Sequence, residues 1–242
     1  MNIIKVDDYQ AMSQWACQHI IDKINQTNHP VLGLATGSTP EGMYQCLIDS
    51  YQAGFVSFKD VTTFNLDEYV GLAIDDPNSY HSFMQDKLFN HINIREEQTH
   101  LPNGNTKDHQ QECKDYERLI QQAKNIDLQI LGIGLNGHIG FNEPGTPFTS
   151  RTHIVELDPL TREANARFFN QKQDVPTHAI TMGIETIMES KEIVLLVSGA
   201  NKAEAVKRLV TGERSESFPA SILKQHDNLT IVVDQAAAVH LN

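Results

Sequence analysis

The stretch Val31-Leu32-Gly33-Leu34-Ala35-Thr36-Gly37-Ser38-Thr39-Pro40 joins a short apolar run to a turn of small residues. An amphipathic segment, residues 40–53, follows at once. The run is apolar at every position, which is typical of a parallel strand covered on both faces. Proline is common in the first turn of a helix, where its missing N–H is not needed. The stretch therefore predicts a strand, a tight turn and a helix in immediate succession.

The same alternation of apolar runs and helical patterns continues along the chain. Strands are predicted at residues 31–35, 61–66, 128–133, 193–197 and 229–233, with a further candidate at 178–182. Helices are predicted at residues 8–24, 40–53, 79–92, 106–123, 161–169 and 201–210. This alternation indicates an α/β fold with an open, mostly parallel sheet and helices on both faces. No repeat or flexible linker interrupts it, so residues 1–242 are predicted to form a single domain.

The composition restricts the classes of partner. The chain has 242 residues, 40% of them hydrophobic, and a net charge of −12. Such an acidic chain repels nucleic acid and anionic membranes, so we expect no nucleic acid and no membrane among its partners. Residues 1–10 lack the apolar run of a signal peptide, and no stretch has the length of a membrane span.

The three cysteines, Cys17, Cys46 and Cys113, form no C-x-x-C pair. An odd number without such spacing indicates reduced thiols rather than a disulfide framework or a zinc site. We therefore expect a cytoplasmic protein.

The turn Thr36-Gly37-Ser38-Thr39 is a candidate phosphate site. Small residues let the backbone approach a ligand, and the N–H groups at the start of the next helix favour an anion. Three hydroxyl groups, on Thr36, Ser38 and Thr39, add donors. The turn is not a nucleotide P-loop, because no Gly-Lys-Ser/Thr follows it. Taken alone, the segment fits an ordinary strand-to-helix turn with capping hydroxyls equally well.

Two adjacent acids, Asp67 and Glu68, follow the apolar run 61–66. In open α/β sheets, ligands bind where the strands end. A partly desolvated carboxylate at that place is a stronger base and could remove a proton from carbon. A helix cap or a solvated loop acid is the more ordinary explanation of the pair when it is taken alone.

Residues 131–144, LGIGLNGHIGFNEP, contain the pattern G-x-G-x-x-G directly after a predicted strand. The dinucleotide fingerprint needs a helix that begins at the third glycine. Gly140, Pro144 and Pro147 prevent a regular helix here, so we predict a loop folded around a small substrate instead.

The same loop carries Asn136, His138 and Glu143. Histidine is suited to proton transfer near neutral pH, and a neighbouring carboxylate can orient its ring. A lone histidine is more often structural, but the position of His138 among glycines favours a catalytic role. No H-x-x-x-H pair includes His138, so we expect no zinc.

Cations for a phosphate lie outside these motifs. Lys202 falls in the first turn of a predicted helix, where a cation opposes the helix dipole and so suggests an anionic ligand. Arg167 lies on an amphipathic segment before Phe168 and Phe169. Each is an ordinary surface charge unless it lies near the Thr36 to Thr39 turn.

Together these segments resemble the glucosamine-6-phosphate deaminase family. The resemblance covers most of the chain in the family's order, and its most specific parts are NLDEYVGL (65–72) and NGHIGFNEP (136–144). The other matching stretches are LGLATGSTP (32–40), LPNGN (101–105), TREANARFF (161–169) and VSGANKA (197–203). The resemblance implies a Rossmann-like sheet and an enzyme that converts glucosamine 6-phosphate and water to fructose 6-phosphate and ammonia. It implies neither a metal nor an organic cofactor.

The resemblance also implies roles for individual residues. Asp67 matches the base that takes the proton from C2 of the substrate. His138 matches the acid–base group that opens the sugar ring, with Glu143 as its partner and Asn136 beside it. The phosphate-binding positions are matched by Thr36, Gly37, Ser38, Thr39, Arg167 and Lys202.

Two departures from the family pattern carry predictions. Asn136 stands where some members have aspartate, and its amide oxygen can hold the imidazole of His138 but brings no charge. Members activated by N-acetylglucosamine 6-phosphate carry basic residues just after the FNEP loop, whereas Val155 and Glu156 stand there in this chain. We therefore expect little or no activation by that compound. We also expect residues 157–182 to close over the sugar as a helical flap.

Two other functions stay open at this point. A 6-phosphogluconolactonase, or another sugar-phosphate enzyme of the same fold, also needs a phosphate site and a loop histidine, but it needs no base for C2. A non-catalytic sugar-phosphate-binding regulator would keep the phosphate turn, with little reason to keep Asp67, His138 and Glu143 together. The sequence also leaves a homo-oligomer open.

Overall fold

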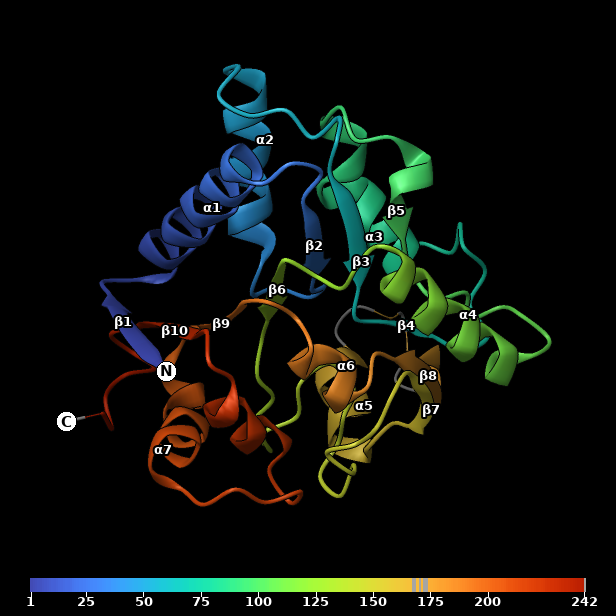
Figure 1. The fold of residues 1–242 in the computed structure, drawn as a ribbon. Coiled ribbons are helices and arrows are strands. Elements are labelled where there is room, and N and C mark those ends of the chain that lie inside the picture. The colour runs from blue at the N-terminus through green and yellow to red at the C-terminus, as the bar shows by residue number, and fades with distance from the viewer. Residues whose placement is uncertain (167–168, 170, 172–173, 242) are drawn as a thin grey trace.

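The computed structural model describes residues 1–166, 169, 171 and 174–241, and Figure 1 shows how their elements are arranged. A seven-stranded sheet of order β1-β10-β9-β6-β2-β3-β5 forms the centre, and its neighbouring strands pair in parallel. The predicted open parallel sheet is confirmed. The strands of this sheet are β1 (Asn2–Val6), β2 (Val31–Leu34), β3 (Thr62–Asn65), β5 (Thr99–His100), β6 (Leu128–Leu131), β9 (Ile193–Val197) and β10 (Leu229–Asp234).

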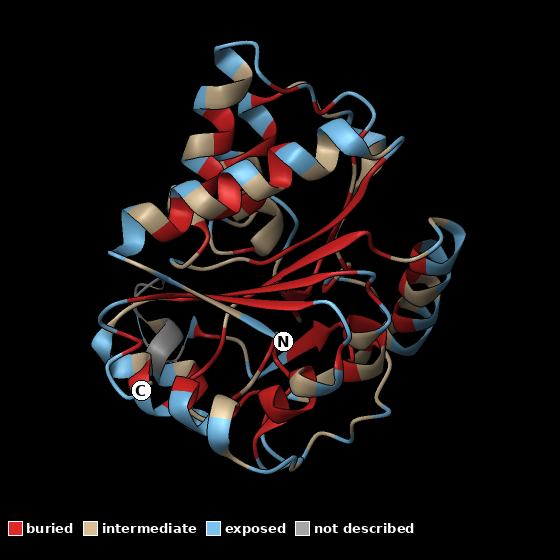
Figure 2. Cartoon of the chain, turned by 60° about the vertical axis from the view of Figure 1, so that its left-hand side comes forward, coloured by how far each residue is buried: buried red, intermediate tan, exposed pale blue. Residues whose placement is uncertain are grey.

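Helices cover both faces of this sheet, as predicted, and the strands between them are buried (Figure 2). One apolar core lies under α1 (Tyr9–Gln26), α2 (Glu41–Gln52) and α3 (Tyr80–Lys87). The other lies under α4 (His109–Gln122), α6 (Ile184–Met188) and α7 (Ala203–Thr211). The remaining helical segments are α5 (Pro159–Asn165) and short turns at Phe89–His91, Glu96–Gln98, Ala200–Lys202 and Pro219–Gln225.

Strand β9 shows why the central strands are apolar at every position. Its side chains at 193, 195 and 197 belong to one core, and those at 194 and 196 belong to the other. Successive side chains of a strand point to opposite faces, so a strand covered on both sides needs an apolar residue at each place.

Capping side chains set the beginnings of three helices. Asp8, Ser79 and Asp108 each accept a hydrogen bond from a backbone N–H three residues further on, at the starts of α1, α3 and α4. Such a cap contributes about 1 kcal/mol to stability. The cap at Ser79 matters most for the site, because it fixes α3 next to the strand that follows β3.

A second, three-stranded sheet has the order β4-β8-β7 and is antiparallel. It consists of β4 (Asp67–Tyr69), β7 (His153–Glu156) and β8 (His178–Thr181). The candidate strand at 178–182 therefore exists, but it belongs to this sheet rather than to the parallel one. The pairing of β4 with β8 places Asp67 opposite Thr181.

The direction of the chain through the parallel sheet changes at β2. From β2 the chain moves outward to β3 and β5, and it then returns to the other side of β2 with β6. Open α/β sheets bind ligands at such a switch point, beyond the carboxyl ends of the strands. The turn 36–39 follows β2 and the glycine-rich loop follows β6, so both motifs lie at this place.

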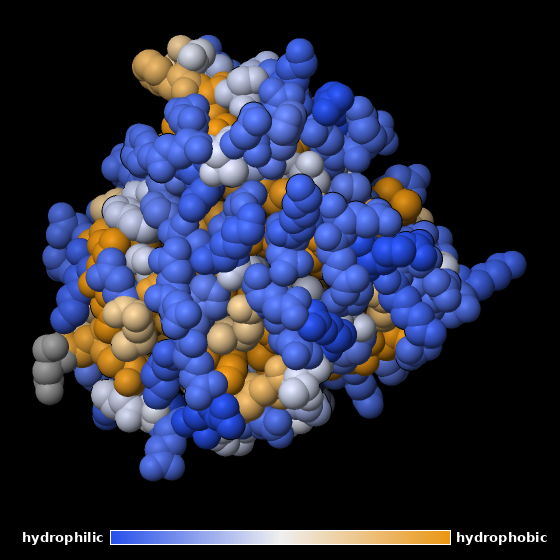
Figure 3. Space-filling model, viewed as in Figure 1, coloured by the Kyte–Doolittle hydropathy of each residue, from blue (hydrophilic) through white to orange (hydrophobic). Residues whose placement is uncertain are grey.

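The surface agrees with the acidic, hydrophilic composition. The face in Figure 3 is mostly hydrophilic, and its apolar side chains form separate small groups. Among the described residues, no helix is both long enough and apolar enough to cross a bilayer.

Candidate active site

Four segments meet at the carboxyl ends of four neighbouring strands. Residues 198–201 follow β9, residues 132–150 follow β6, residues 36–39 follow β2, and residues 67–69 follow β3. One hollow of about 370 Å³ is lined by Ser38 and Thr39 of the turn after β2 and by Ser198 of the turn after β9. The order of strands thus brings the sequence motifs to one edge of the sheet.

The glycine-rich loop contains no helix between residues 132 and 150, so the rejection of a dinucleotide fingerprint is confirmed. The ring of His138 lies directly against Gly134. A Cβ atom at Gly134 would be 2.3 Å from Cε1 of that ring, so only glycine leaves room for the ring in this position. The loop glycines therefore place a histidine ring rather than a phosphate.

His138 and Glu143 form an acid–base pair within this loop. Nδ1 of His138 lies 3.5 Å from Oε2 of Glu143, a contact longer than an ordinary hydrogen bond. Glu143 is 8% exposed. Burial by itself would raise the pKa of Glu143, but the nearby His138 ring and hydrogen bonds from Thr161 and Asn136 outweigh it and hold the pKa below its usual value. Glu143 is therefore charged and can stabilise an imidazolium.

Asn136 acts on Glu143 and not on the imidazole. Its Nδ2 donates to Oε2 of Glu143 at 2.8 Å, and its Oδ1 accepts from the backbone N–H of His138 at 3.2 Å. The prediction that the amide oxygen holds the ring was therefore wrong. The backbone amide lies within reach of that oxygen because the two residues are only two positions apart in a tight turn.

Thr161 is a site residue that the sequence did not reveal. Its hydroxyl, on α5, donates to Oε1 of Glu143 at 2.5 Å, and its side chain is buried. Thr161 begins the stretch TREANARFF, so the resemblance drew attention to the segment but gave this position no role.

Asp67 is a buried carboxylate at the start of β4. It is 6% exposed, and burial raises its pKa to about 8, with the charge of Glu68 as a second cause. A carboxylate with such a pKa is a much stronger base than one in water.

The glycine-rich loop lies directly on Asp67. Gly140 has a φ of +57°, and a Cβ atom there would be 3.4 Å from Oδ2 of Asp67 and 3.0 Å from Oγ1 of Thr181. Oγ1 of Thr181 also accepts a hydrogen bond from the backbone N–H of Phe141 at 3.1 Å. Gly140 is two residues from His138, so the loop that carries the histidine lies against the Asp67 carboxylate.

An aromatic cluster connects the phosphate turn to both of these segments. The ring of Tyr80 stacks on Phe141 of the loop, with centroids 6.0 Å apart, and lies 4.9 Å from the ring of Tyr69 in β4. The side chain of Thr36 counteracts part of the rise that burial causes in the pKa of the Tyr80 hydroxyl, so the turn 36–39 lies near this ring. Thr36, Asp67 and His138 therefore lie on segments that pack against one another.

Of the two predicted phosphate cations, Lys202 and Arg167, the structure describes only Lys202. Lys202 lies at the end of the short helical turn after β9, and its Nζ donates to the carbonyl of Ile133 at 2.7 Å, where the glycine-rich loop begins. Asp234 accepts hydrogen bonds from Ser198 and from the N–H of Gly199 and so fixes the neighbouring turn. Arg167 lies outside the described residues.

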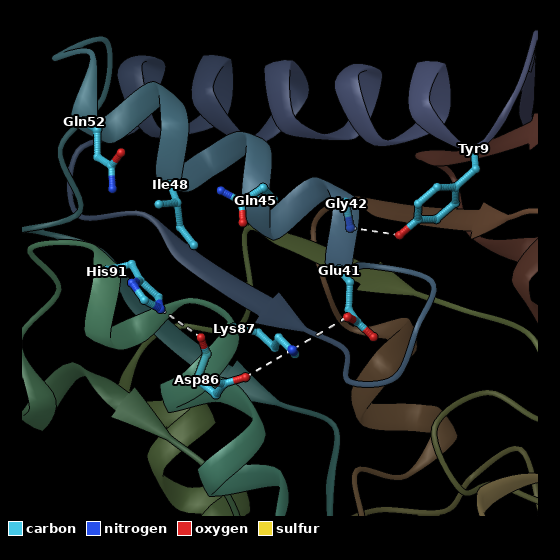
Figure 4. A pocket seen from close by; sticks show the side chains of 9 residues that line it. All are labelled: Tyr9, Glu41, Gly42, Gln45, Ile48, Gln52, Asp86, Lys87 and His91. Atoms are coloured by element: carbon cyan, nitrogen blue, oxygen red, sulfur yellow. Dashed lines mark hydrogen bonds and ion pairs between the residues drawn. The ribbon is translucent and has the colours of Figure 1, made fainter. Parts of the chain in front are cut away.

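The hydroxyl of Tyr9, at the start of α1, bonds to the turn 36–39 and to the start of α2. It donates to the carbonyl of Ser38 at 3.0 Å and accepts from the N–H of Gly42 at 2.8 Å, as Figure 4 shows for Gly42. Tyr9 and Glu41 separate the phosphate hollow from a second hollow of about 650 Å³ that α2 lines. The hydroxyl of Tyr9 thereby ties the turn 36–39 to the start of α2.

We expect Tyr9→Phe to raise KM for a phosphorylated substrate about fivefold to thirtyfold, because each of the two lost hydrogen bonds is worth about 1 kcal/mol, while kcat stays near its original value. Steady-state kinetics would measure both constants. Tyr51→Phe is the matched control, since Tyr51 packs on Phe58 at the far end of α2. Equal KM values for the two variants would contradict the role given to Tyr9.

Among the described residues, no group of three or more histidine, cysteine, aspartate or glutamate side chains is arranged to hold a metal ion. The residues that meet at the site are a buried carboxylate, a histidine–glutamate pair and small hydroxyl residues. Fold and site together define an α/β enzyme that carries out acid–base chemistry at the carboxyl edge of a parallel sheet.

The chain belongs to the family described as glucosamine-6-phosphate isomerases/6-phosphogluconolactonase, whose sequence profile matches residues 7–232. The glucosamine-6-phosphate deaminase of Oceanobacillus iheyensis is 60% identical over 237 residues, which cover 98% of this chain and 95% of that protein. Glucosamine-6-phosphate deaminase 1 of Bacillus subtilis is 51% identical over 238 residues, 98% of each chain. The resemblance found in the motifs is confirmed.

Solved structures agree with this assignment. A monomeric glucosamine-6-phosphate deaminase superposes with a TM-score of 0.97 at 51% identity, covering 99% of both chains. A 6-phosphogluconolactonase from Trypanosoma brucei superposes with a TM-score of 0.81 over 100% of this chain and 98% of its own. The identity to the lactonase is 18%, so that likeness shows the fold alone.

Proposed function

We propose that this protein converts glucosamine 6-phosphate and water to fructose 6-phosphate and ammonia. The observation that carries the proposal is the buried Asp67, which lies against the loop that bears His138. Relatives that are 51% and 60% identical over nearly the whole chain are named as deaminases of this substrate. A base of raised pKa beside an acid–base histidine is what an isomerisation coupled to deamination requires.

The phosphate of the substrate binds at the turn Thr36-Gly37-Ser38-Thr39. Backbone N–H groups at the start of α2 and the hydroxyl groups of the turn donate to its oxygens. Lys202, on the neighbouring turn, supplies positive charge, and we assign the same role to Arg167. Charge-assisted hydrogen bonds of this kind contribute about 1.5–3 kcal/mol each.

Ring opening is the task of His138. Its imidazole takes the proton of the anomeric hydroxyl and returns a proton to the ring oxygen, which gives the open aldose. Glu143 lies 3.5 Å from Nδ1 and stabilises the imidazolium in between. Asn136 and Thr161 hold Glu143 in place.

Asp67 then carries out the isomerisation. Its carboxylate removes the proton from C2, the electrons move onto the C1 carbonyl, and the carbonyl oxygen takes a proton from the substrate ammonium, which gives a neutral enolamine. The protonated carboxyl returns the proton to C1, which gives an imine at C2. Water adds to this imine and ammonia leaves, so the products are fructose 6-phosphate and ammonia. The carbonyl of the substrate accepts the electrons, so the reaction needs neither a metal nor an organic cofactor.

A 6-phosphogluconolactonase is the second candidate, because the family includes that activity. A lactonase has no proton to remove from C2, and Asp67 distinguishes the two reactions. Ammonia release from glucosamine 6-phosphate tests the proposal, with unphosphorylated glucosamine as the control. Hydrolysis of 6-phosphogluconolactone without ammonia release from the amino sugar would support the lactonase. Binding of glucosamine 6-phosphate without either reaction would support a regulator.

The remaining proposals concern the compartment in which the enzyme acts, a movement of the chain and the regulation of the enzyme. We propose that the enzyme acts in the cytoplasm in amino-sugar catabolism, which the three free cysteines support. The predicted flap, residues 157–182, is wrong for its last part, because residues 178–181 form β8 between β4 and β7. We propose that the part before β8 closes over the sugar, since α5 already bonds to Glu143 through Thr161; residues 167, 168, 170, 172 and 173 lie outside the described part of the chain. The prediction of little activation by N-acetylglucosamine 6-phosphate stands: a sigmoidal substrate curve that this compound makes hyperbolic would contradict it.

A further inference from the structure

Asp234 is a buried carboxylate at the carboxyl end of β10, and the mechanism above gives it no part. It is 4% exposed. Strand β10 pairs in parallel with β9, with Val233 opposite Val197, so Asp234 lies beside Ser198, the first residue after β9. Ser198 lines the hollow of about 370 Å³ next to the turn 36–39, and Asp234 lies behind Ser198 rather than in the lining.

Both oxygens of the Asp234 side chain accept hydrogen bonds. Oδ2 accepts from the hydroxyl of Ser198 and, at 3.0 Å, from the backbone N–H of Gly199. Oδ1 accepts from the backbone N–H of Ala237 at 2.7 Å. Two of these donors belong to the turn after β9, and one belongs to the turn after β10. The side chain therefore joins two neighbouring turns at the edge of the sheet where the site lies.

A structural cap for the turn after β10 would need only the bond from Ala237. The bonds from Ser198 and Gly199 reach across to the next strand instead. Gly199 has a φ of +97°, a conformation that residues with a side chain rarely adopt. Gly199 and Asp234 together therefore set the direction in which the chain leaves β9.

The chain that leaves β9 in this direction is the turn 198–202, which carries the proposed phosphate cation. Lys202 lies at its end, and Nζ of Lys202 donates to the carbonyl of Ile133 at 2.7 Å. The hydroxyl of Ser198 gives its one proton to Asp234, so its oxygen offers only lone pairs to a ligand. Asp234 can therefore act on a bound anion through the position of the turn, and not through a donor on Ser198.

We propose that Asp234 is a positioning residue for the phosphate site, which holds the turn 198–202 and so keeps Lys202 beside the bound phosphate. This inference rests on the proposed function, in which the phosphate binds next to this turn and the turn 36–39. The charge of Asp234 and its hydrogen bonds act in opposite directions. A negative charge near the site weakens the binding of an anion, whereas a turn that is fixed in advance strengthens it.

The test is the dissociation constant for inorganic phosphate, measured by isothermal titration calorimetry, which needs no reaction. We expect Asp234→Asn to raise this constant about tenfold, because the amide has one acceptor oxygen where the carboxylate has two. KM for glucosamine 6-phosphate should rise with it, while kcat stays within about twofold of its original value. If the charge of Asp234 outweighed its hydrogen bonds, the same variant would bind phosphate more tightly.

Asp127→Asn is the matched control. Asp127 is also a buried carboxylate that accepts a backbone N–H, that of Val31, but this bond lies at the start of β2, on the opposite edge of the sheet. We expect this control to leave the dissociation constant for phosphate unchanged. An unchanged or lower constant in Asp234→Asn, an equal rise in both variants, or a loss of kcat with KM retained would overturn the inference.

Ser198→Ala covers the case in which Asp234→Asn does not fold. It keeps the bond from Gly199 and removes the bond from the hydroxyl, so we expect the dissociation constant for phosphate to rise about threefold. An unchanged constant in this variant would refute the role of Asp234. The proposed function is tested separately, by ammonia release from glucosamine 6-phosphate. Release of ammonia together with an unchanged phosphate constant in Asp234→Asn would remove this inference alone.

Discussion

Asp67→Asn should lower kcat for ammonia release by about 10⁴-fold, the upper end of what one positioned acid–base group contributes. The amide cannot accept the C2 proton, so exchange of the C2 hydrogen with deuterated solvent should stop as well. Both are measured directly, by ammonia assay and by NMR of the recovered substrate. Asp86→Asn, on the exposed end of α3, is the control and should keep both activities. Continued C2 exchange in Asp67→Asn would remove the proposed reaction.

The same variant should be more stable than the original protein, and increasingly so as the pH rises. The raised pKa means that the folded protein keeps the Asp67 proton up to about pH 8, whereas the unfolded chain releases it near pH 4. The folded state thus binds more protons in this window, so its free energy of unfolding falls with pH there and levels off above pH 8. Asparagine removes this dependence. The stability advantage of Asp67→Asn should widen by about 2–3 kcal/mol between pH 6 and pH 9, as measured by urea denaturation. A constant difference would mean that the carboxyl is not held protonated.

His138→Gln should lower kcat by about 10²–10³-fold and leave KM nearly unchanged, because the ring acts on the sugar and not on the phosphate. The residual activity should come from substrate that opens without help. His91→Gln is the control, since the exposed ring of His91 bonds to the carbonyl of Asp86 at the end of α3. A rise in KM with kcat retained would instead make His138 a binding residue.

The parallel sheet could be predicted from the sequence because its central strands are apolar at every position. Strand β1 could not be predicted in this way. It lies at the edge of the sheet, and the exposed Asn2 and Lys5 interrupt its apolar pattern. Strand β5 has only two residues and shows no periodicity. Strand β4 exists because it pairs with β8, more than 100 residues away, and no local pattern reports such a pairing.

The residues of the site likewise fall into those that a local sequence pattern reveals and those that it does not. Asp67, His138 and Glu143 could be found because reactive residue types stand on loops directly after apolar runs. Thr161 could not be found in this way, because it bonds to Glu143 through a contact between separate segments that no local pattern reports. The error at Asn136 has the same origin, because the partner of an amide oxygen depends on the exact fold of the turn.

The pairing of β1 with β10 joins the two ends of the sequence into one edge of the sheet. During synthesis, β1 is made before its partner β10, so this edge of the sheet stays incomplete until β10 has also been made. Every residue of β10 is buried, and its edge is covered by β1. Removal of β1 would expose the edge of β10, and the shortened enzyme would then be prone to self-association during expression.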